Sequence, residues 1–171
     1  MKLNKKFIFN MVLIIFPWLS VLFIGKRSFK RFSFTGIFII VFEILNHMYG
    51  KKRKWWTFYG RSNSFLLNEL PFSIGPYMPV TLWLLKLSYG NFKKFILLNA
   101  IFDGIFAAVV MKILKAMKII RLNNLNTLQF FFYIHYKAYL LYGIQYWYEN
   151  MKDRHIYLLR HKWLHFTTRM R

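Results

Sequence analysis

Long runs of apolar residues, separated by short clusters of basic residues, give this chain its pattern. A hydrocarbon core about 30 Å thick is crossed by roughly 20 apolar residues in helical form, because unpaired backbone groups cannot face lipid. Several stretches approach that length. We therefore predict an all-α, polytopic membrane helix bundle of about five transmembrane helices, with spans over residues 7–25, 32–49, 65–89, 95–113 and 128–148.

The segments between and after these spans have an interfacial composition. Residues 51–61, KKRKWWTFYGR, place two tryptophans and a tyrosine beside cations, as in the aromatic belt of a membrane protein. Residues 112–121 carry apolar and basic positions at helical spacing, which predicts an interfacial extension of the fourth span. Residues 150–171 repeat apolar positions every three or four residues, which predicts a separate amphipathic helix on the membrane surface. We expect residues 1–171 to form a single membrane domain.

The third span contains an unusual density of helix-breaking residues. They are Pro71, Gly75, Pro76 and Pro79. Three prolines in nine residues predict a break, and irregular backbone at membrane depth occurs where it is buried in protein or lines a cavity. If this segment crosses, the cations divide equally between the two sides. If it re-enters, the inner side carries twice as many, as the positive-inside rule requires. Crossing is our default, because 25 residues suffice to span, and re-entry stays open.

Composition and charge support the membrane prediction. The chain of 171 residues is 57% hydrophobic, whereas ordinary soluble domains are about 45–50% apolar. It carries 26 Lys and Arg against 5 Asp and Glu. The cations flank the apolar runs and no nucleic-acid-binding motif accompanies them, so we expect anionic lipid headgroups as partners and no nucleic acid. Heavy use of Phe, Ile, Lys, Asn and Tyr suggests an AT-rich genome and a bacterial plasma membrane. The first apolar run lacks a signal-peptide cleavage site, which predicts a retained helix.

Ionisable side chains within the predicted spans are the candidate chemistry, because each costs about 2.5–3.5 kcal/mol at the centre of a membrane helix. The polar intramembrane set comprises Glu43, Asn46, His47, Glu69, Asn99, Asp103, His135 and Lys137. One hypothesis is that the acids and His47 converge in a polar cavity, as a proton relay or cation site. The other is interhelical hydrogen bonding that fixes packing, worth about 0.6 kcal/mol per bond. For Lys137, near the middle of its span, we expect Asp103 or Glu43 as partner.

Several kinds of active site are not indicated. The chain has no cysteine, so thiolate metal sites and Cys nucleophiles are excluded. Glu43 with His47, and His161 with His165, have helical spacing, but neither pair is joined by the third ligand and catalytic Glu of a zinc enzyme. No nucleophile elbow, phosphate-binding loop or dinucleotide-binding motif is present. We therefore assign no catalytic residue, metal or cofactor.

Residues 65–148 carry a pattern that resembles a known group of proteins. The pattern starts at LPFSIGPYMPVTLWLLKLSYGNFKKFILLNAIFDGIFAAVV and continues through RLNNLNTLQFFFYIHYKAYLL. It combines a proline-broken apolar segment, a basic turn, a helix with an acid, a basic linker and an aromatic last span. In this it resembles small multi-pass membrane proteins of unassigned function from spore-forming bacteria. The resemblance implies a bacterial membrane protein and no particular activity.

Three functional hypotheses follow from the sequence. The first is a non-enzymatic accessory or partner-binding membrane protein, whose small residues in the fourth span let other membrane helices, or a second copy of the chain, approach closely. The alternative is a small transporter or proton-coupled permease component, in which the proline-rich break and the acids line a path. A second alternative is an intramembrane enzyme, which requires Glu43, His47, Glu69 or Asp103 to meet at one point.

Overall fold

A computed structural model of the chain describes the backbone of residues 5–59 and 68–169, and the side chains of residues 8–59 and 68–154. The described part is mostly helical. Its elements, in chain order, are α1 (Lys5–Val21), α2 (Lys26–Lys52), β1 (Trp56–Phe58), α4 (Leu70–Phe72), the π-helix η1 (Ser73–Tyr77), α5 (Met78–Ser88), α6 (Phe92–Ile105), the π-helix η2 (Phe106–Val110), α7 (Met111–Ala116), β2 (Ile120–Leu122) and α8 (Thr127–Arg169).

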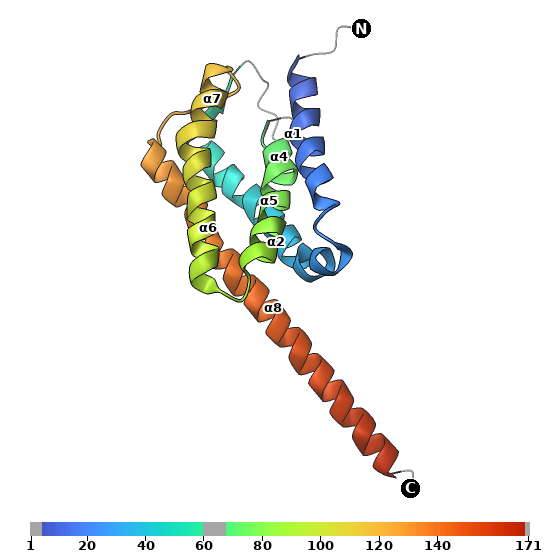
Figure 1. The fold of residues 1–171 in the computed structure, drawn as a ribbon. Helices are drawn as coiled ribbons and strands as arrows, with labels where there is room; N and C mark the ends of the chain where they lie inside the picture. The colour runs from blue at the N-terminus through green and yellow to red at the C-terminus, as the bar shows by residue number, and fades with distance from the viewer. Residues whose placement is uncertain (1–4, 60–67, 170–171) are drawn as a thin grey trace.

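Within the described ranges, the helical elements join into five continuous segments that alternate in direction (Figure 1). The α1–α2 turn and the α5–α6 turn lie at one end of the bundle. Strands β1 and β2 lie at the other end, where they pair antiparallel with Trp56 opposite Leu122. This small sheet departs from the all-α prediction. Strand β1 lies within residues 51–61, for which we expected an interfacial segment, and β2 overlaps the end of residues 112–121, for which we expected a helical extension.

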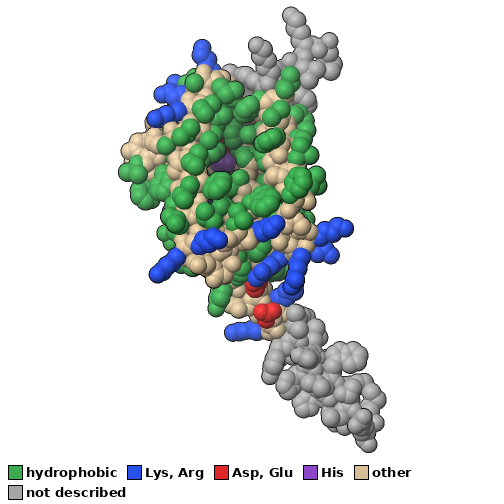
Figure 2. All heavy atoms as spheres, in the orientation of Figure 1, with side chains coloured by type: hydrophobic (Ala, Val, Ile, Leu, Met, Phe, Trp, Pro, Cys, Tyr) green, Lys and Arg blue, Asp and Glu red, His purple; other side chains and the backbone are tan. Residues whose placement is uncertain are grey.

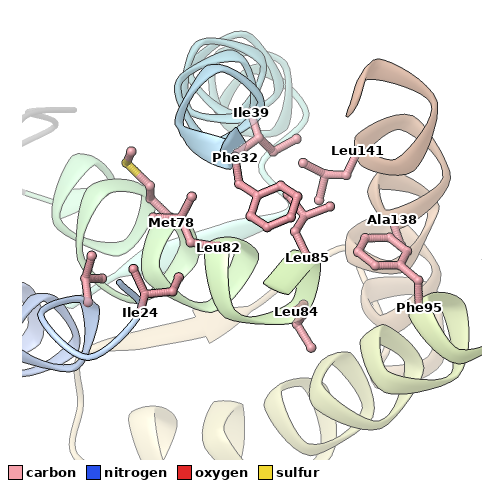
Figure 3. Packing of buried hydrophobic residues seen from close by; sticks show 11 residues of the cluster. Ile24, Phe32, Ile39, Met78, Leu82, Leu84, Leu85, Phe95, Ala138 and Leu141 are labelled. Atoms are coloured by element: carbon pink, nitrogen blue, oxygen red, sulfur yellow. The ribbon is translucent and has the colours of Figure 1, made fainter. Parts of the chain in front are cut away.

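The main hydrophobic core surrounds α5, which packs against α1, α2 and α6. Figure 3 shows Leu82 and Leu85 of α5 among side chains from α2, α6 and α8. Ile39, Leu82, Leu85 and Phe95 are fully buried. Gly36 of α2 permits this approach, since an added Cβ would lie 3.3 Å from both Leu82 and Met78 side-chain atoms. The core therefore places α5 at the centre of the bundle, where it also lines the site described below.

The proline-rich segment is helical throughout and changes its hydrogen-bond pattern where the prolines lie. Proline has no N–H, so Pro76 and Pro79 leave carbonyls of the preceding turn without their usual donors. The Met78 N–H bonds to the Ser73 carbonyl, five residues back, and releases the Ile74 carbonyl. The Trp18 indole of α1 donates to that carbonyl at 2.9 Å. The predicted break is thus a π-helical turn tied to α1, and the helix does not end there.

The same segment runs from one end of the bundle to the other. At its start, Glu69 accepts a hydrogen bond from the indole of Trp56, in β1. Near its end, the Lys86 ammonium lies 3.5 Å from the Phe23 carbonyl, in the α1–α2 turn. In Figure 1 the start of α4, near β1, and the α1–α2 turn lie at opposite ends of the bundle. The helix therefore runs from one end of the bundle to the other, and the choice between crossing and re-entry stays a prediction.

Two helical segments, Lys26–Lys52 and Phe92–Ala116, are long and apolar enough to cross a membrane, and Ile8–Val21 is a shorter apolar helix. Only 28% and 17% of the apolar windows of the two longer segments are buried inside the molecule. Most of their apolar side chains therefore face outward. Figure 2 shows hydrophobic side chains over the middle of one face, with Lys and Arg gathered toward its two ends.

Residues 150–171 do not start a new helix. Helix α8 continues without interruption from Thr127 to Arg169 and leaves the bundle as a single rod (Figure 1). Residues 150–169 are therefore helical, as predicted, but as part of α8 and not as a separate helix; their placement on a membrane surface stays a prediction, and Met170 and Arg171 lie outside the described residues. A helix of 43 residues is about 64 Å long at 1.5 Å per residue, twice the thickness of a hydrocarbon core.

An ion pair fixes α8 where it leaves the bundle. The Arg31 guanidinium donates two hydrogen bonds to the Glu149 carboxylate, at 2.5 and 2.9 Å. The Gln145 side chain also donates to Glu149, at 2.8 Å, and accepts from the buried Thr35 hydroxyl at 2.6 Å. The hydrogen bonds from Arg31 hold the pKa of Glu149 below its ordinary value of 4.5. The ionised carboxylate is thus the form that the folded chain stabilises.

This pairing predicts a pH dependence of stability. Because the pKa of Glu149 is lowered on folding, its contribution is complete above about pH 4.5 and is lost as the pH falls through the lower folded-state pKa. We expect Glu149→Gln to lower the free energy of unfolding by less than about 1 kcal/mol at pH 7, because the pair is partly solvated, and by progressively less as the pH falls below about 4.5. Unfolding of the purified protein in detergent, measured across this range, tests the prediction. Asp153→Asn, an exposed acid of α8, is the control and should show no such trend.

Candidate functional site

A cavity of about 190 Å³ lies between α2, the α4–η1–α5 segment, the α6–η2–α7 segment and α8. Glu43, Glu69 and Asp103 line it, so it gathers three of the five acids in the whole chain. Figure 2 shows a histidine side chain at the bottom of a hollow between hydrophobic side chains. Most of the wall is apolar, and the charged groups converge from different helices.

Both π-helical turns border this cavity. Ser73, Pro76 and Tyr77 of η1 line it on one side, and Phe106 of η2 lines it on the other. A π-turn inserts one extra residue into a helix and so re-aims the side chains around it, and such turns are frequent at functional sites. The sequence pattern indicated irregularity at η1 through its prolines. It gave no signal for η2, where the segment FAAVV contains neither proline nor glycine.

The centre of the site is a buried ion pair between Glu43 of α2 and Lys137 of α8. The Lys137 ammonium contacts Glu43 Oε1, and the two residues are 1% and 4% exposed respectively. The ammonium also lies over the Tyr133 ring, 4.3 Å from its centroid, and 5.7 Å from that of Tyr77. Such ring faces attract cations, so two aromatic side chains add to the counter-ion. Glu43 is one of the two partners that the sequence suggested for Lys137.

His47 lies between two carboxylates and presents a different ring nitrogen to each. Its Nε2 is 3.6 Å from Glu43 Oε2, one helical turn away on α2. Its Nδ1 is 4.0 Å from Glu69 Oε2 and 3.5 Å from the Ser73 hydroxyl. The helical spacing of Glu43 and His47 predicted their common face. The approach of Glu69 depends on the fold, because it comes from a separate segment of the chain.

Trp56 is a member of this site that sequence reasoning placed elsewhere. Its indole N–H donates to Glu69 Oε1 at 3.3 Å, and its ring meets the His47 ring edge to face at 5.5 Å between centroids. The ring lies against Gly50, where an added Cβ would come within 2.3 Å of it. The sequence indicated only an interfacial aromatic belt for KKRKWWTFYGR. The pairing of β1 with β2, which turns Trp56 inward, joins segments more than 60 residues apart.

A second acid–base pair lies at the edge of the cavity. Asp103 of α6 and His135 of α8 form a hydrogen bond, with Asp103 Oδ2 and His135 Nδ1 2.9 Å apart. His135 stacks on the Phe131 ring, 5.2 Å away and nearly parallel, and does not itself line the cavity. Asn99, one turn before Asp103, does line it and donates to the Phe95 carbonyl of its own helix at 2.7 Å.

Six of the eight polar residues singled out in the sequence therefore line one cavity. They are Glu43, His47, Glu69, Asn99, Asp103 and Lys137. His135 is held behind Asp103, and Asn46 instead accepts a hydrogen bond from the exposed Tyr136 at 3.1 Å. Of the four predicted helix-break residues, Pro76 lines the cavity, Pro71 and Pro79 are buried, and Gly75 packs against the backbone of α1.

Two polar atoms at the cavity have no hydrogen-bond partner in the part of the chain that the structure describes. They are Glu69 Oε2 and the Tyr133 hydroxyl, both buried; a third such atom, Glu43 Oε1, is ion-paired with Lys137. Leaving a buried polar atom unsatisfied is costly, and most such atoms in folded proteins are paired. Among the described residues, no three His, Cys, Asp or Glu side chains are grouped so as to hold a metal ion. The cavity therefore offers an acceptor oxygen to a donor or cation in a mostly apolar setting.

Comparison of the chain with protein families, curated proteins and solved structures gives no match in any of the three.

Proposed function

We propose that the chain is a multi-pass protein of the plasma membrane, with five spans, and that it acts as a small proton-coupled transporter or as the solute-binding component of one. The observation that carries this proposal is the convergence of Glu43, His47, Glu69, Asp103 and Lys137 on a single cavity. Each ionisable group at membrane depth costs about 2.5–3.5 kcal/mol, so five of them around one space favour a functional role over packing alone.

The outer surface supports a position in the bilayer. Phe16, Leu22 and Phe23 are each at least 75% exposed, and large apolar side chains of α2, α6 and α8 are exposed as well. Monomeric soluble proteins rarely expose apolar patches of more than a few hundred Å². Here the polar groups are inside and the apolar groups outside, the arrangement that a lipid environment favours.

The alternating helix directions support five crossings. The α1–α2 and α5–α6 turns meet at one end, and β1, β2 and the start of α4 meet at the other. The proline-rich segment passes through the whole bundle, which favours a crossing over a re-entrant loop. Its π-turn lines the cavity, as expected where a discontinuous helix contributes to a solute path.

The protonation chemistry favours transport over an accessory role. His47 can accept a proton at one ring nitrogen while it releases one from the other, so it can connect the carboxyl groups of Glu69 and Glu43. An accessory protein has no need of this arrangement. The convergence of Glu43, His47, Glu69 and Asp103 also meets the condition for an intramembrane enzyme, and the labelling experiment below separates the two, because only transport requires a cavity that is reached from both faces.

A second candidate, partner binding, is favoured by α8. The helix runs on beyond Glu149 as a rod outside the bundle, and a partner could pack along it (Figure 1). The two roles are compatible, since a solute-binding component can also dock on a larger assembly.

Labelling of single cysteines tests the proposal directly, because the chain has none of its own. Exposed residues Asn91 and Asn123 lie at opposite ends of the bundle, and Thr81 lines the cavity. In intact cells and inverted vesicles, we expect Asn91→Cys and Asn123→Cys to react with a membrane-impermeant maleimide from opposite faces. Thr81→Cys should react with a small impermeant thiosulfonate from both faces, as alternating access requires.

The matched control is Val109→Cys, on the exposed apolar surface of η2, which should stay unlabelled by the charged reagent. Labelling of Asn91→Cys and Asn123→Cys from the same face would overturn the five-span topology. Labelling of Thr81→Cys from one face only would overturn transport and leave a binding protein.

A further inference from the structure

We propose that the cavity binds a small organic cation with an apolar body, such as an aryl or branched alkyl ammonium, with its charged group beside Glu69. This inference rests on the proposed function for its physiological role, because it names the class of solute that the transporter would carry. The binding itself is a property of the folded chain and is testable without transport.

The charge of the cavity favours a cation. A protein with a net charge of +21 places three of its five acids around this space and only one Lys or Arg among the described lining residues, Lys137. That lysine is already engaged with Glu43. Asp103 is bonded to His135. Glu69 is the acid left without a close cation, since its contacts are the Trp56 indole and, at 4.0 Å, His47, with the exposed Lys51 acting on it electrostatically.

Glu69 also has the geometry of an incomplete site. The residue is 5% exposed, and its Oε2 is buried with no hydrogen-bond donor in the described part of the chain. The Trp56 indole donates to the other oxygen, Oε1, so Oε2 is the carboxylate oxygen left without a hydrogen-bond donor. An ammonium at this point would satisfy the carboxylate in the way that Lys137 satisfies Glu43.

Aromatic side chains provide the second half of the recognition. Trp56, Phe58, Phe72 and Tyr133 line the cavity around Glu69 and His47. The ring of Tyr133 lies 5.7 Å from that of Trp56, and its other contacts include the Lys137 ammonium at 4.3 Å, so this wall already accepts one cation. Ring faces attract desolvated ammonium groups, and organic ammonium ligands are commonly held this way.

The lining of the cavity suits an organic cation better than a metal ion. A metal ion needs several oxygen or nitrogen ligands at short range, and no suitable group of three ligands is present among the described residues. The predominantly apolar lining suits a hydrocarbon body instead. A volume of about 190 Å³ is below the roughly 300 Å³ of drug-sized pockets, which limits the ligand to about one ring.

The test is equilibrium binding of radiolabelled benzylammonium to the purified full-length protein in detergent, because a primary ammonium can donate to Glu69 Oε2 whereas a quaternary one cannot. We expect saturable binding that excess sodium does not displace. Glu69→Gln should weaken it about 30-fold or more, because it removes one member of a buried charge pair while its amide oxygen can still accept from Trp56. Tyr133→Leu should weaken it several-fold through the lost ring. Asp153→Asn, an exposed acid outside the cavity, should bind as the unaltered protein does.

Each outcome decides the inference. No saturable binding, or equal binding to the unaltered protein and a folded Glu69→Gln variant, overturns it. If Glu69→Gln does not fold, Tyr133→Leu provides the same comparison at a second wall. Displacement by sodium at equimolar concentration would make the site one for an inorganic cation and also overturns it. Failure of binding together with two-sided labelling of Thr81→Cys would reject this solute class and retain transport, whereas binding with one-sided labelling would reject transport alone.

Discussion

Replacing Lys137 by methionine should lower the free energy of unfolding by about 3 kcal/mol, and adding Glu43→Gln to that variant should restore most of the loss. Lys137 is 1% exposed and its ammonium contacts Glu43. Without it, the folded protein must hold the Glu43 carboxylate in an apolar setting, where a lone charge is far more costly than a neutral amide. Recovery of stability in the double variant is the decisive result. If each substitution only removed packing, the losses from Lys137→Met and Glu43→Gln would add.

The measurement is unfolding of the purified variants in detergent, followed by tryptophan fluorescence, as a double-mutant cycle. The control is Lys86→Met, which removes an exposed lysine whose ammonium lies 3.5 Å from the Phe23 carbonyl at the end of the bundle. It should change stability by less than about 0.5 kcal/mol. Additive losses in Lys137→Met and Glu43→Gln, with no recovery in the double variant, would mean that the two side chains are not paired.

The Lys137–Glu43 pair also shows which part of the site could be predicted from the sequence. An ionisable residue in the middle of an apolar span needs a partner inside the protein, so Lys137 could be assigned an acid before any fold was known. The choice between Glu43 and Asp103 could not be made, because it depends on which helix faces α8 at that depth. In the same way, the spacing of Glu43 and His47 predicted one face of α2, while the arrival of Glu69 beside His47 required the path of the proline-rich segment.

Trp56 shows a different limit. Its neighbours in sequence are cations and aromatic residues, the composition of a membrane interface. The pairing of β1 with β2 turns Trp56 inward, and these two strands of three residues each are distant in sequence. Strands this short give almost no periodic signal. The fit of its ring against Gly50 is likewise a tertiary contact. A local pattern could therefore predict that the segment lies at the end of the bundle but not that it closes the cavity.

The continuous α8 and the second π-turn were missed for related reasons. The change from an apolar to a basic amphipathic pattern predicts the start of a new helix. However, residues 148–150 contain neither glycine nor proline, so nothing in the sequence ends the preceding helix there. A π-turn without proline has no composition of its own. At η1, by contrast, prolines remove two backbone donors, so the irregularity itself could be predicted and only its form could not.

Gly75→Ala should have the second large effect, and its sign opposes helix propensity. Alanine normally stabilises a helix relative to glycine by about 0.5–1 kcal/mol. In η1, however, a Cβ at this position would lie 2.5 Å from the Leu13 carbonyl oxygen of α1 and 3.1 Å from its carbon. Backbone atoms of a packed helix cannot turn aside as a long side chain can. We expect α1 to be displaced and the free energy of unfolding to fall by about 2 kcal/mol.

The matched control is Gly143→Ala in α8, where an added Cβ meets nothing within 4 Å and should be neutral or stabilising. Both variants are compared by unfolding in detergent, and the displacement of α1 by the fluorescence of Trp18, whose indole donates to the Ile74 carbonyl of η1. Because that bond satisfies the carbonyl that the π-turn releases, moving α1 would leave it unpaired and disturb the wall of the cavity at Pro76 and Tyr77. Equal stability of the two variants, with unchanged Trp18 fluorescence, would mean that α1 does not support η1 and that the proline-rich turn holds its shape by its own backbone alone.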